Sequence, residues 1–172
     1  MSIIAIGGGD LTHKIFSNIM QHVKINYNNL YIGIITDATF LTPKKNIEKV
    51  INGFNKQKRY FPTVKFIIND FKLLDYKNNK LDLLRYFSYV NILFITGGHQ
   101  QNIYNNILTL KKNNINVSKY FIEFLSRGGL LVGTSAGASI LGPVMPPVLG
   151  KGIGLINTII DQHFITNKRF HR

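Results

Sequence analysis

The sequence contains no cysteine, few acidic residues and no long uninterrupted apolar run. The absence of cysteine excludes disulfide bonds, thiolate metal sites and a cysteine nucleophile. No stretch approaches the roughly 18 apolar residues of a membrane-spanning helix, and the N-terminal residues lack the basic and apolar regions of a signal peptide. We therefore expect a cytoplasmic protein without a membrane partner, whose covalent chemistry uses oxygen or nitrogen.

Acidic residues number only 8 against 21 lysines and arginines, which gives a formal net charge of +13. Such a charge would suit a nucleic-acid partner, because clustered lysines neutralise phosphates. The basic residues are scattered, however, with one modest concentration at residues 44–59, and no nucleic-acid-binding motif accompanies them. We expect no nucleic-acid partner, whereas the positive field would equally attract an acidic substrate.

The length of 172 residues and a hydrophobic content of 45% predict one folded domain over residues 1–172. Between short apolar runs of strand length lie segments with helical spacing of apolar residues. This alternation predicts an α/β fold in three layers, with a mostly parallel sheet covered by helices on both faces. The expected strands are residues 3–6, 31–35, 64–68, 92–95, 130–132 and 158–160, and the expected helices include 15–23, 47–54, 103–110 and 120–124. Residues 77–80 and 113–116 are expected as polar loops.

Three turns of small residues, 7–10, 97–100 and 133–137, follow predicted strands. Ligands in parallel sheets collect beyond the carboxyl ends of the strands, so the active cleft should form where these turns converge. The first turn, Gly-Gly-Gly-Asp, lacks the dinucleotide-binding pattern, because Thr12 stands where its third glycine belongs. We expect a tight turn near the site there.

The most informative segment is Gly-Gly-Leu-Leu-Val-Gly-Thr-Ser-Ala-Gly-Ala at residues 128–138, where a short apolar run enters a G-x-S-x-G turn. At a nucleophile elbow the chain turns so sharply from strand to helix that the residues beside the serine must have almost no side chain. Gly133, Ala136, Gly137 and Ala138 meet this condition. Ser135 is therefore the predicted nucleophile, although a turn selected for packing alone would show the same pattern.

A serine hydroxyl needs a base to remove its proton, and the chain contains five histidines. His13 and His22 fall on a predicted surface helix, and His171 lies next to the C-terminus. His163 follows the predicted strand 158–160 in a polar cluster, which favours it as the base over a purely structural histidine.

Three separated motifs, at residues 97–100 (Gly-Gly-His-Gln), 133–138 (Gly-Thr-Ser-Ala-Gly-Ala) and 161–164 (Asp-Gln-His-Phe), are followed by Arg169 and Arg172. In order and style they resemble cyanophycinase, within the wider serine peptidase family (peptidase S51) that also contains aspartyl dipeptidases. The resemblance spans nearly the whole chain and implies a fold similar to the class I glutamine amidotransferase domain. It implies a hydrolase that cuts peptide bonds next to aspartate, with cyanophycinases releasing β-Asp-Arg dipeptides from a storage polymer.

The resemblance also implies roles for individual residues. Ser135 would be the nucleophile and His163 the general base, while the backbone N–H groups of Gly98 and Ala136 would form the oxyanion hole. No metal or organic cofactor is implied, and the partner would be a peptide containing aspartate or arginine. The implied substrate-binding residues are Gln100, Asp161, Gln162, Arg169 and Arg172, although the two arginines would equally suit a solvated basic tail.

Departures from the family pattern affect substrate and activity. His99 replaces a common aspartate or asparagine, and Asn167 replaces a common arginine, which weakens the prediction of the polymer as substrate. Family members continue beyond the arginine cluster, whereas this chain ends at Arg172, so we expect part of the C-terminal fold to be missing. Such a loss would expose an unpaired sheet edge and favour a homodimer.

The third member of the catalytic triad stays open. Asp161 lies between Ser135 and His163 in the sequence and shares a strand face with His163 if the predicted strand continues. Other acids that folding could bring close are Asp10, Asp37 and Glu123. Loss of the orienting acid lowers turnover by about 10⁴ in the triad template, so four hypotheses remain: a cyanophycinase-type peptidase, an aspartyl dipeptidase, an inactive remnant that binds a peptide or partner, and a nucleic-acid-binding module.

Overall fold

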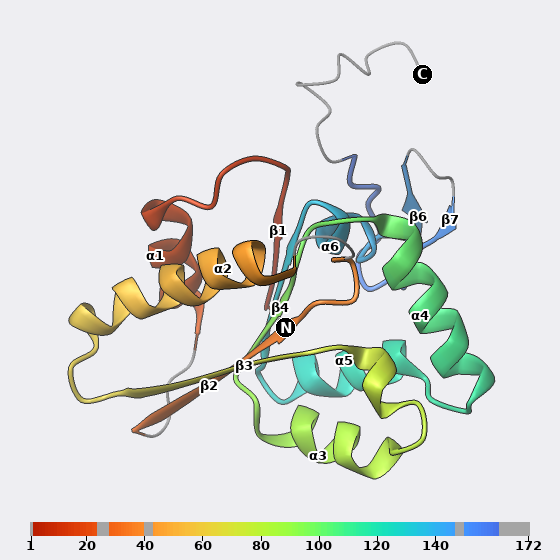
Figure 1. Ribbon diagram of the computed structural model, residues 1–172, viewed down its shortest axis with the longest axis horizontal. Coiled ribbons are helices and arrows are strands. Elements are labelled where there is room, and N and C mark those ends of the chain that lie inside the picture. Colours follow the sequence, from red (N-terminus) through yellow and green to blue (C-terminus); the bar gives the residue numbers. More distant parts are fainter. Residues whose placement is uncertain (1, 24–27, 40–42, 147–149, 162–172) are drawn as a thin grey trace.

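The computed structural model describes residues 2–23, 28–39, 43–146 and 150–161. Five parallel strands form one sheet in the order β1-β5-β4-β2-β3 (Figure 1). The strands are β1 (Ser2–Ile6), β2 (Asn29–Ile35), β3 (Lys65–Phe71), β4 (Ile92–Ile95) and β5 (Leu130–Thr134). The predicted α/β class with a parallel sheet is confirmed, and five of the six predicted strands lie where the apolar runs placed them.

Helices cover both faces of this sheet, so the predicted three layers are present (Figure 1). On one face lie α1 (His13–His22) and α2 (Pro43–Gln57), and on the other α3 (Lys80–Tyr89), α4 (Gln100–Lys112), α5 (Val117–Ser126) and α6 (Ala136–Ser139). Two 3₁₀ turns, η1 (Lys58–Tyr60) and η2 (Leu73–Tyr76), complete the main domain. A small antiparallel pair, β6 (Val144–Met145) and β7 (Gly150–Lys151), lies apart from the main sheet.

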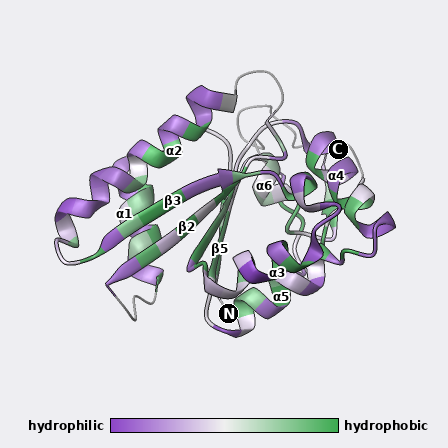
Figure 2. Cartoon of the chain, turned by 60° about the horizontal axis from the view of Figure 1, so that its bottom comes forward, coloured by the Kyte–Doolittle hydropathy of each residue, from purple (hydrophilic) through white to green (hydrophobic). Residues whose placement is uncertain are grey.

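The central strands are apolar on both faces, as expected for a covered parallel sheet. In β4, Ile92 and Phe94 pack into the cluster with α1 and α2, whereas Leu93 and Ile95 pack into the cluster with α3 to α6. Each such side chain contributes roughly 1.5–3 kcal/mol when it is fully buried. Figure 2 shows β5 as hydrophobic and α2 as largely hydrophilic with hydrophobic bands. The rigid layer that results carries the turns at its carboxyl edge.

The predicted strand at residues 158–160 is wrong, because these residues form no strand. The carbonyl of Ile160 accepts a hydrogen bond from the Ser139 hydroxyl at 2.9 Å, and Ile159 is 57% exposed. The segment therefore lies against α6 instead of joining the sheet. Thr158 and Ile159 are exposed and Ile160 is partly buried, so this apolar run does not mark a core strand.

Two elements were missed by the sequence patterns, namely α3 and the β6–β7 pair. Helix α3 begins at Lys80, inside the segment expected as a polar loop, and the Asn79 side chain accepts the Asp82 N–H at 3.2 Å as an N-cap. This pattern of Asn followed three residues later by Asp is a start signal for a helix. The β6 and β7 strands have two residues each and are too short to show a period.

Strand β1 forms one edge of the sheet, since it pairs only with β5 in the part of the chain that the structure describes. Its side chains are only partly covered, in contrast to the fully buried β4 and β5. In the same described ranges, no helix is long and apolar enough to cross a membrane.

Candidate active site

Ser135 occupies the turn between β5 and α6, with backbone angles φ 51° and ψ −118°. A non-glycine residue in such a conformation costs of order 1–3 kcal/mol, which the surrounding structure must offset. The Ser135 N–H donates to the carbonyl of Ile6 at 2.9 Å, and the Ser135 carbonyl accepts the N–H groups of Ala138 and Ser139 at 2.9 and 3.0 Å. These bonds hold the strained turn, and the predicted strand-to-helix elbow is confirmed.

The small residues of this turn are required by space. A Cβ atom on Gly133 would lie 2.3 Å from the carbonyl oxygen of Gly137, and one on Gly137 would lie 2.3 Å from the carbonyl oxygen of Ile95. Real Cβ atoms essentially never approach backbone oxygens so closely, and backbone cannot move aside as a flexible side chain can. The helix therefore packs directly on the strand backbone, which fixes the position of Ser135.

The Gly97-Gly98 loop after β4 lies beside Ser135. A Cβ on Gly97 would be 2.9 Å from Ser135 Cβ and 3.5 Å from its Oγ, and a Cβ on Gly98 would be 2.1 Å from the carbonyl oxygen of Ala38. Gly98 has φ +147°, a conformation that favours glycine. The neighbouring His99 N–H donates to the same Ala38 carbonyl at 2.7 Å. The loop after β4 is thus fixed against the loop after β2.

Two backbone N–H groups predicted for the oxyanion hole belong to these two turns. Ala136 is the first residue of α6, where an N–H has no intrahelical acceptor. Gly98 lines the same cavity as Ser135. The structure therefore places both predicted donor residues close to Ser135.

Asp37 holds the loop after β2 in place. Its buried carboxylate accepts the Leu73 N–H at 2.7 Å, the Leu74 N–H at 3.3 Å and the Asn106 side-chain amide at 2.9 Å. Burial raises the pKa of the Asp37 carboxyl above its ordinary value, while these hydrogen bonds lower it in part. Asp37 directly precedes Ala38, so this network fixes the carbonyl against which Gly98 packs.

A cavity of about 220 Å³ opens over Ser135 at the carboxyl edge of the sheet. All three predicted turns contribute to its wall, which confirms that they converge. The wall is completed by α2. The lining residues are Gly9, Asp10, Leu11, Asn46, Lys49, Val50, Thr96, Gly97, Gly98, Thr134 and Ser135.

The predicted substrate-binding residues differ in their burial. Gln100 is 5% exposed, and its side-chain amide donates to the carbonyl of Pro146 at 2.7 Å, so it ties α4 to the β6–β7 segment. Asp161 is partly buried and is absent from the cavity wall. The remaining predictions lie outside the described residues, namely His163, Gln162, Arg169, Arg172 and the departure at Asn167.

The acids considered for the third triad position differ in their surroundings. Asp37 is engaged with η2 and α4, as described above. Glu123 pairs with Lys119 at 3.7 Å on α5, the helix that leads into the start of β5, whereas Ser135 follows the end of that strand. Asp10 shares the cavity with Ser135 and lies 3.8 Å from Lys49. Only Asp10 among these three lines the cavity.

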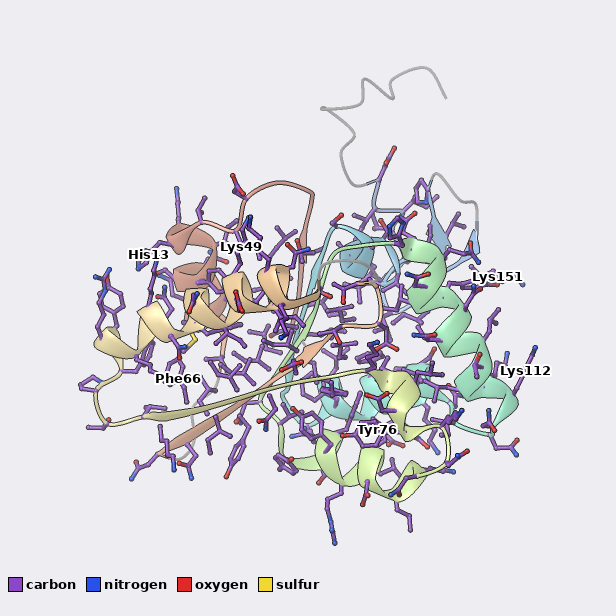
Figure 3. The ribbon with its side chains drawn as sticks, viewed as in Figure 1. His13, Lys49, Phe66, Tyr76, Lys112 and Lys151 are labelled. Carbon is purple, nitrogen blue, oxygen red and sulfur yellow. The ribbon has the colours of Figure 1, made fainter. Side chains whose placement is uncertain are left out.

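Lys49 and Asn46 line the cavity but were not predicted from the sequence, where residues 44–59 stood out only as a modest concentration of basic residues. The signal that could have found them is helical spacing. Asn46, Lys49, Val50 and Gly53 share one face of α2, and Val50 is buried in the core, so that face must turn towards the sheet. Figure 3 shows Lys49 on α2, on the side of the loop between β1 and α1.

The described residues contain no group of three His, Asp or Glu side chains placed to hold a metal ion.

The fold is similar to that of a solved structure. No protein-family model and no curated protein matches the sequence. A crystal structure from Listeria monocytogenes EGD-e, described as a putative peptidase E, aligns with a TM-score of 0.63 at 13% sequence identity. The alignment covers 96% of this chain and 83% of that chain. This likeness establishes a shared α/β architecture over nearly the whole chain.

Proposed function

We propose that this protein is a serine peptidase that hydrolyses peptide bonds next to aspartate, with Ser135 as nucleophile and His163 as general base. The observation that carries the proposal is the strained Ser135 turn, held by packing and hydrogen bonds at the edge of a cavity. Strained non-glycine residues cluster at functional sites. A turn selected only for packing would have glycine at φ 51°, because glycine adopts this angle without strain.

The position of Ile160 supports a role for His163. Ser139 lies one helical turn after Ser135, and its hydroxyl holds the Ile160 carbonyl at 2.9 Å. His163 is three residues further along, and three residues span at most about 10 Å. This short chain length is compatible with the proposed role of His163.

The proposed reaction begins when the imidazole of His163 takes the proton of the Ser135 hydroxyl as its oxygen attacks the scissile carbonyl. The N–H groups of Ala136 and Gly98 donate to the oxyanion that forms. His163 then gives the proton to the leaving amine, and the acyl-serine ester remains. A water molecule, deprotonated by the same histidine, hydrolyses the ester and restores Ser135.

We favour short aspartyl peptides over the aspartate–arginine polymer as substrates. The cavity of about 220 Å³ is smaller than the roughly 300–1,000 Å³ of sites for drug-sized ligands, and it suits one amino-acid residue. The second candidate, cyanophycin cleavage, would use Gln100 for substrate, but that side chain is buried and bonded to Pro146. The Listeria protein, described as a putative peptidase E, shares the architecture and does not distinguish between the two substrates.

The test combines labelling with turnover. A fluorophosphonate probe should form one adduct on Ser135, and the protein should release product from aspartyl dipeptides faster than from the polymer. Ser135→Ala should remove both the adduct and turnover, while Ser126→Ala, at an exposed serine that ends α5, serves as a matched serine control and should keep both. Turnover that survives in Ser135→Ala would reject the mechanism, and absence of labelling in a folded wild type would favour the inactive binding protein.

Two further proposals concern the setting of the protein. We propose a cytoplasmic location, and a homodimer that pairs through the β1 edge, whose side chains are only partly covered. Sedimentation of the purified chain tests the dimer. A single monomeric species at micromolar concentration, or a dimer unaffected by Ile4→Lys on β1, would contradict it.

A further inference from the structure

The cavity wall opposite the Ser135 turn is formed by α2 and carries one cationic side chain, Lys49. Its ammonium nitrogen lies 3.8 Å from the carboxylate of Asp10, beyond the 2.7–2.9 Å of a charge-assisted hydrogen bond. Lys49 is 57% exposed and Asp10 is 93% exposed, so both charges remain hydrated and their attraction is weak. A ligand carboxylate that enters the cavity can therefore replace Asp10 at the ammonium group.

The rest of the wall defines the size and polarity of the group that would meet Lys49. Leu11 and Val50 supply apolar surface next to it, and Asn46, one turn earlier on α2, supplies a side-chain amide. The cavity wall thus combines apolar surface, one cation and a neutral polar group. This combination suits a carboxylate on a short aliphatic stem, as in an aspartate side chain.

Helix α2 has a positive charge in its first half, which favours the binding of a carboxylate. The first half of the helix carries Lys44 and Lys45 as well as Lys49, against one acid, Glu48. No acidic residue lies in its first turn. Anions are attracted to such a surface over distances of about a Debye length, so α2 favours entry of acidic ligands into the cavity.

We propose that Lys49 is a specificity-determining residue, which binds the side-chain carboxylate of the substrate residue whose carbonyl faces Ser135. The proposal rests on the proposed peptidase function and adds to it the group that selects acidic over neutral peptides. Asp10 is the competitor in this scheme, since it holds Lys49 when the cavity is empty and releases it to the ligand. The two partners of one ion pair should therefore affect ligand affinity in opposite directions.

Binding tests this without any need for turnover. The ligands are N-acetyl-aspartic acid amide and N-acetyl-asparagine amide, which have nearly the same shape and differ by one negative charge. Their affinities for the full chain carrying Ser135→Ala are measured by NMR titration at low ionic strength. We expect the acidic amide to bind about tenfold more tightly than the neutral one, because a hydrogen bond to a charged group is stronger than a neutral one.

Variants then assign the preference to Lys49. Lys49→Met should remove the tenfold preference, and Lys49→Arg should restore most of it. Asp10→Asn should strengthen binding of the acidic amide by about threefold, since it removes the competing carboxylate. Lys45→Met is the matched control, because it removes the same charge from the same helix at an exposed position outside the cavity wall, and it should change the preference little.

Each outcome decides the proposal separately from the peptidase function. Equal affinity of the wild-type cavity for both amides, or a preference that survives in Lys49→Met, overturns the role of Lys49 even if aspartyl peptides are cleaved. Binding of inorganic phosphate as tight as that of the acidic amide would identify a general anion site and also overturn it. A preference that depends on Lys49 in a protein that cleaves no peptide would keep this assignment and reject the peptidase.

Discussion

Two glycine-rich turns meet at the same end of the sheet, and they have little in common beyond composition. In the turn around Ser135, a Cβ on Gly133 or Gly137 would lie 2.3 Å from a backbone oxygen. In the turn after β1, a Cβ on Gly7 or Gly9 would meet no atom within 4 Å. Glycine is required by close packing in the first turn, whereas space in the second is open.

The positions of the strands explain this difference. β5 lies between β1 and β4, so the turn that follows it is enclosed by the backbone of its neighbours. β1 lies at an edge of the sheet that the described residues form, and the turn after it contributes Gly9 and Asp10 to the cavity wall. The enclosed turn can hold a reactive group rigidly, while the open turn can supply cavity wall that adapts to a ligand. Within the proposed site, the turn that carries the catalytic serine is therefore packed more closely than the turn after β1.

The largest effect should come from adding one methyl group to the enclosed turn. Gly137→Ala places a Cβ against the Ile95 carbonyl, and overpacking of this kind costs about 3 kcal/mol. The free energy of unfolding in urea measures it. The matched variant Gly7→Ala adds the same group to the open turn and should change stability by less than about 0.5 kcal/mol. Similar losses in the two variants would show that the turns do not differ as described.

An intermediate effect is expected at Asp37, which holds the loop that supports Gly98. Asp37→Asn should destabilise the protein by about 1–3 kcal/mol, because the amide cannot accept every hydrogen bond that the carboxylate accepts. The folded pKa of Asp37 lies above its ordinary value of 3.8, so its contribution is fully present below that pH and is lost as pH rises through the folded pKa.

The stability difference between wild type and Asp37→Asn should therefore shrink as pH rises above 3.8. Urea unfolding of both proteins at several pH values from 4 to 7 measures this difference, and titrations common to both proteins cancel. A difference that grows with pH would mean that the hydrogen bonds, rather than burial, determine the direction of the Asp37 pKa shift.

The smallest effect on stability is expected for substitutions of Ser135 in the enclosed turn. Ser135→Gly removes the side chain from a residue at φ 51°, and relief of that strain should stabilise the fold by about 1 kcal/mol after the added freedom of the unfolded chain is subtracted. Ser135→Ala keeps a Cβ and should not show the gain. If Ser135→Gly proves no more stable than Ser135→Ala in urea, the turn is not strained in the manner proposed.

The sequence located the elements with strong periodic patterns. The apolar runs at 31–35 and 92–95 predicted β2 and β4, because buried parallel strands are apolar on both faces. The short run at 158–160 also contains two isoleucines, yet the Ile160 carbonyl is bonded to Ser139 on α6 and no strand forms. A short apolar segment shows that burial is favourable but does not identify what covers it, so this distinction needed the structure.

Within the candidate site, the turn that carries Ser135 could be predicted from the sequence. The G-x-S-x-G pattern identified Ser135, since few sequences allow such a tight turn from strand to helix. Lys49 was missed because a lysine in a basic helix resembles a solvated charge, although its spacing from the buried Val50 and from Gly53 placed it on the sheet-facing side of α2. Gln100 was assigned to substrate binding through the family resemblance, while the structure shows its amide bonded to Pro146, a residue 46 positions away.

The sequence by itself determined the alternation of strands and helices, the three turns and the serine elbow, because these depend on local geometry and on which side chains avoid water. Only the tertiary structure decided that β5 is enclosed between β1 and β4, that the loop after β2 supports Gly98, and that α2 brings Lys49 into the wall of the cavity that Ser135 lines. These relations join segments tens of residues apart. Their energies arise from packing and from desolvated hydrogen bonds, which exist only once the layers have come together.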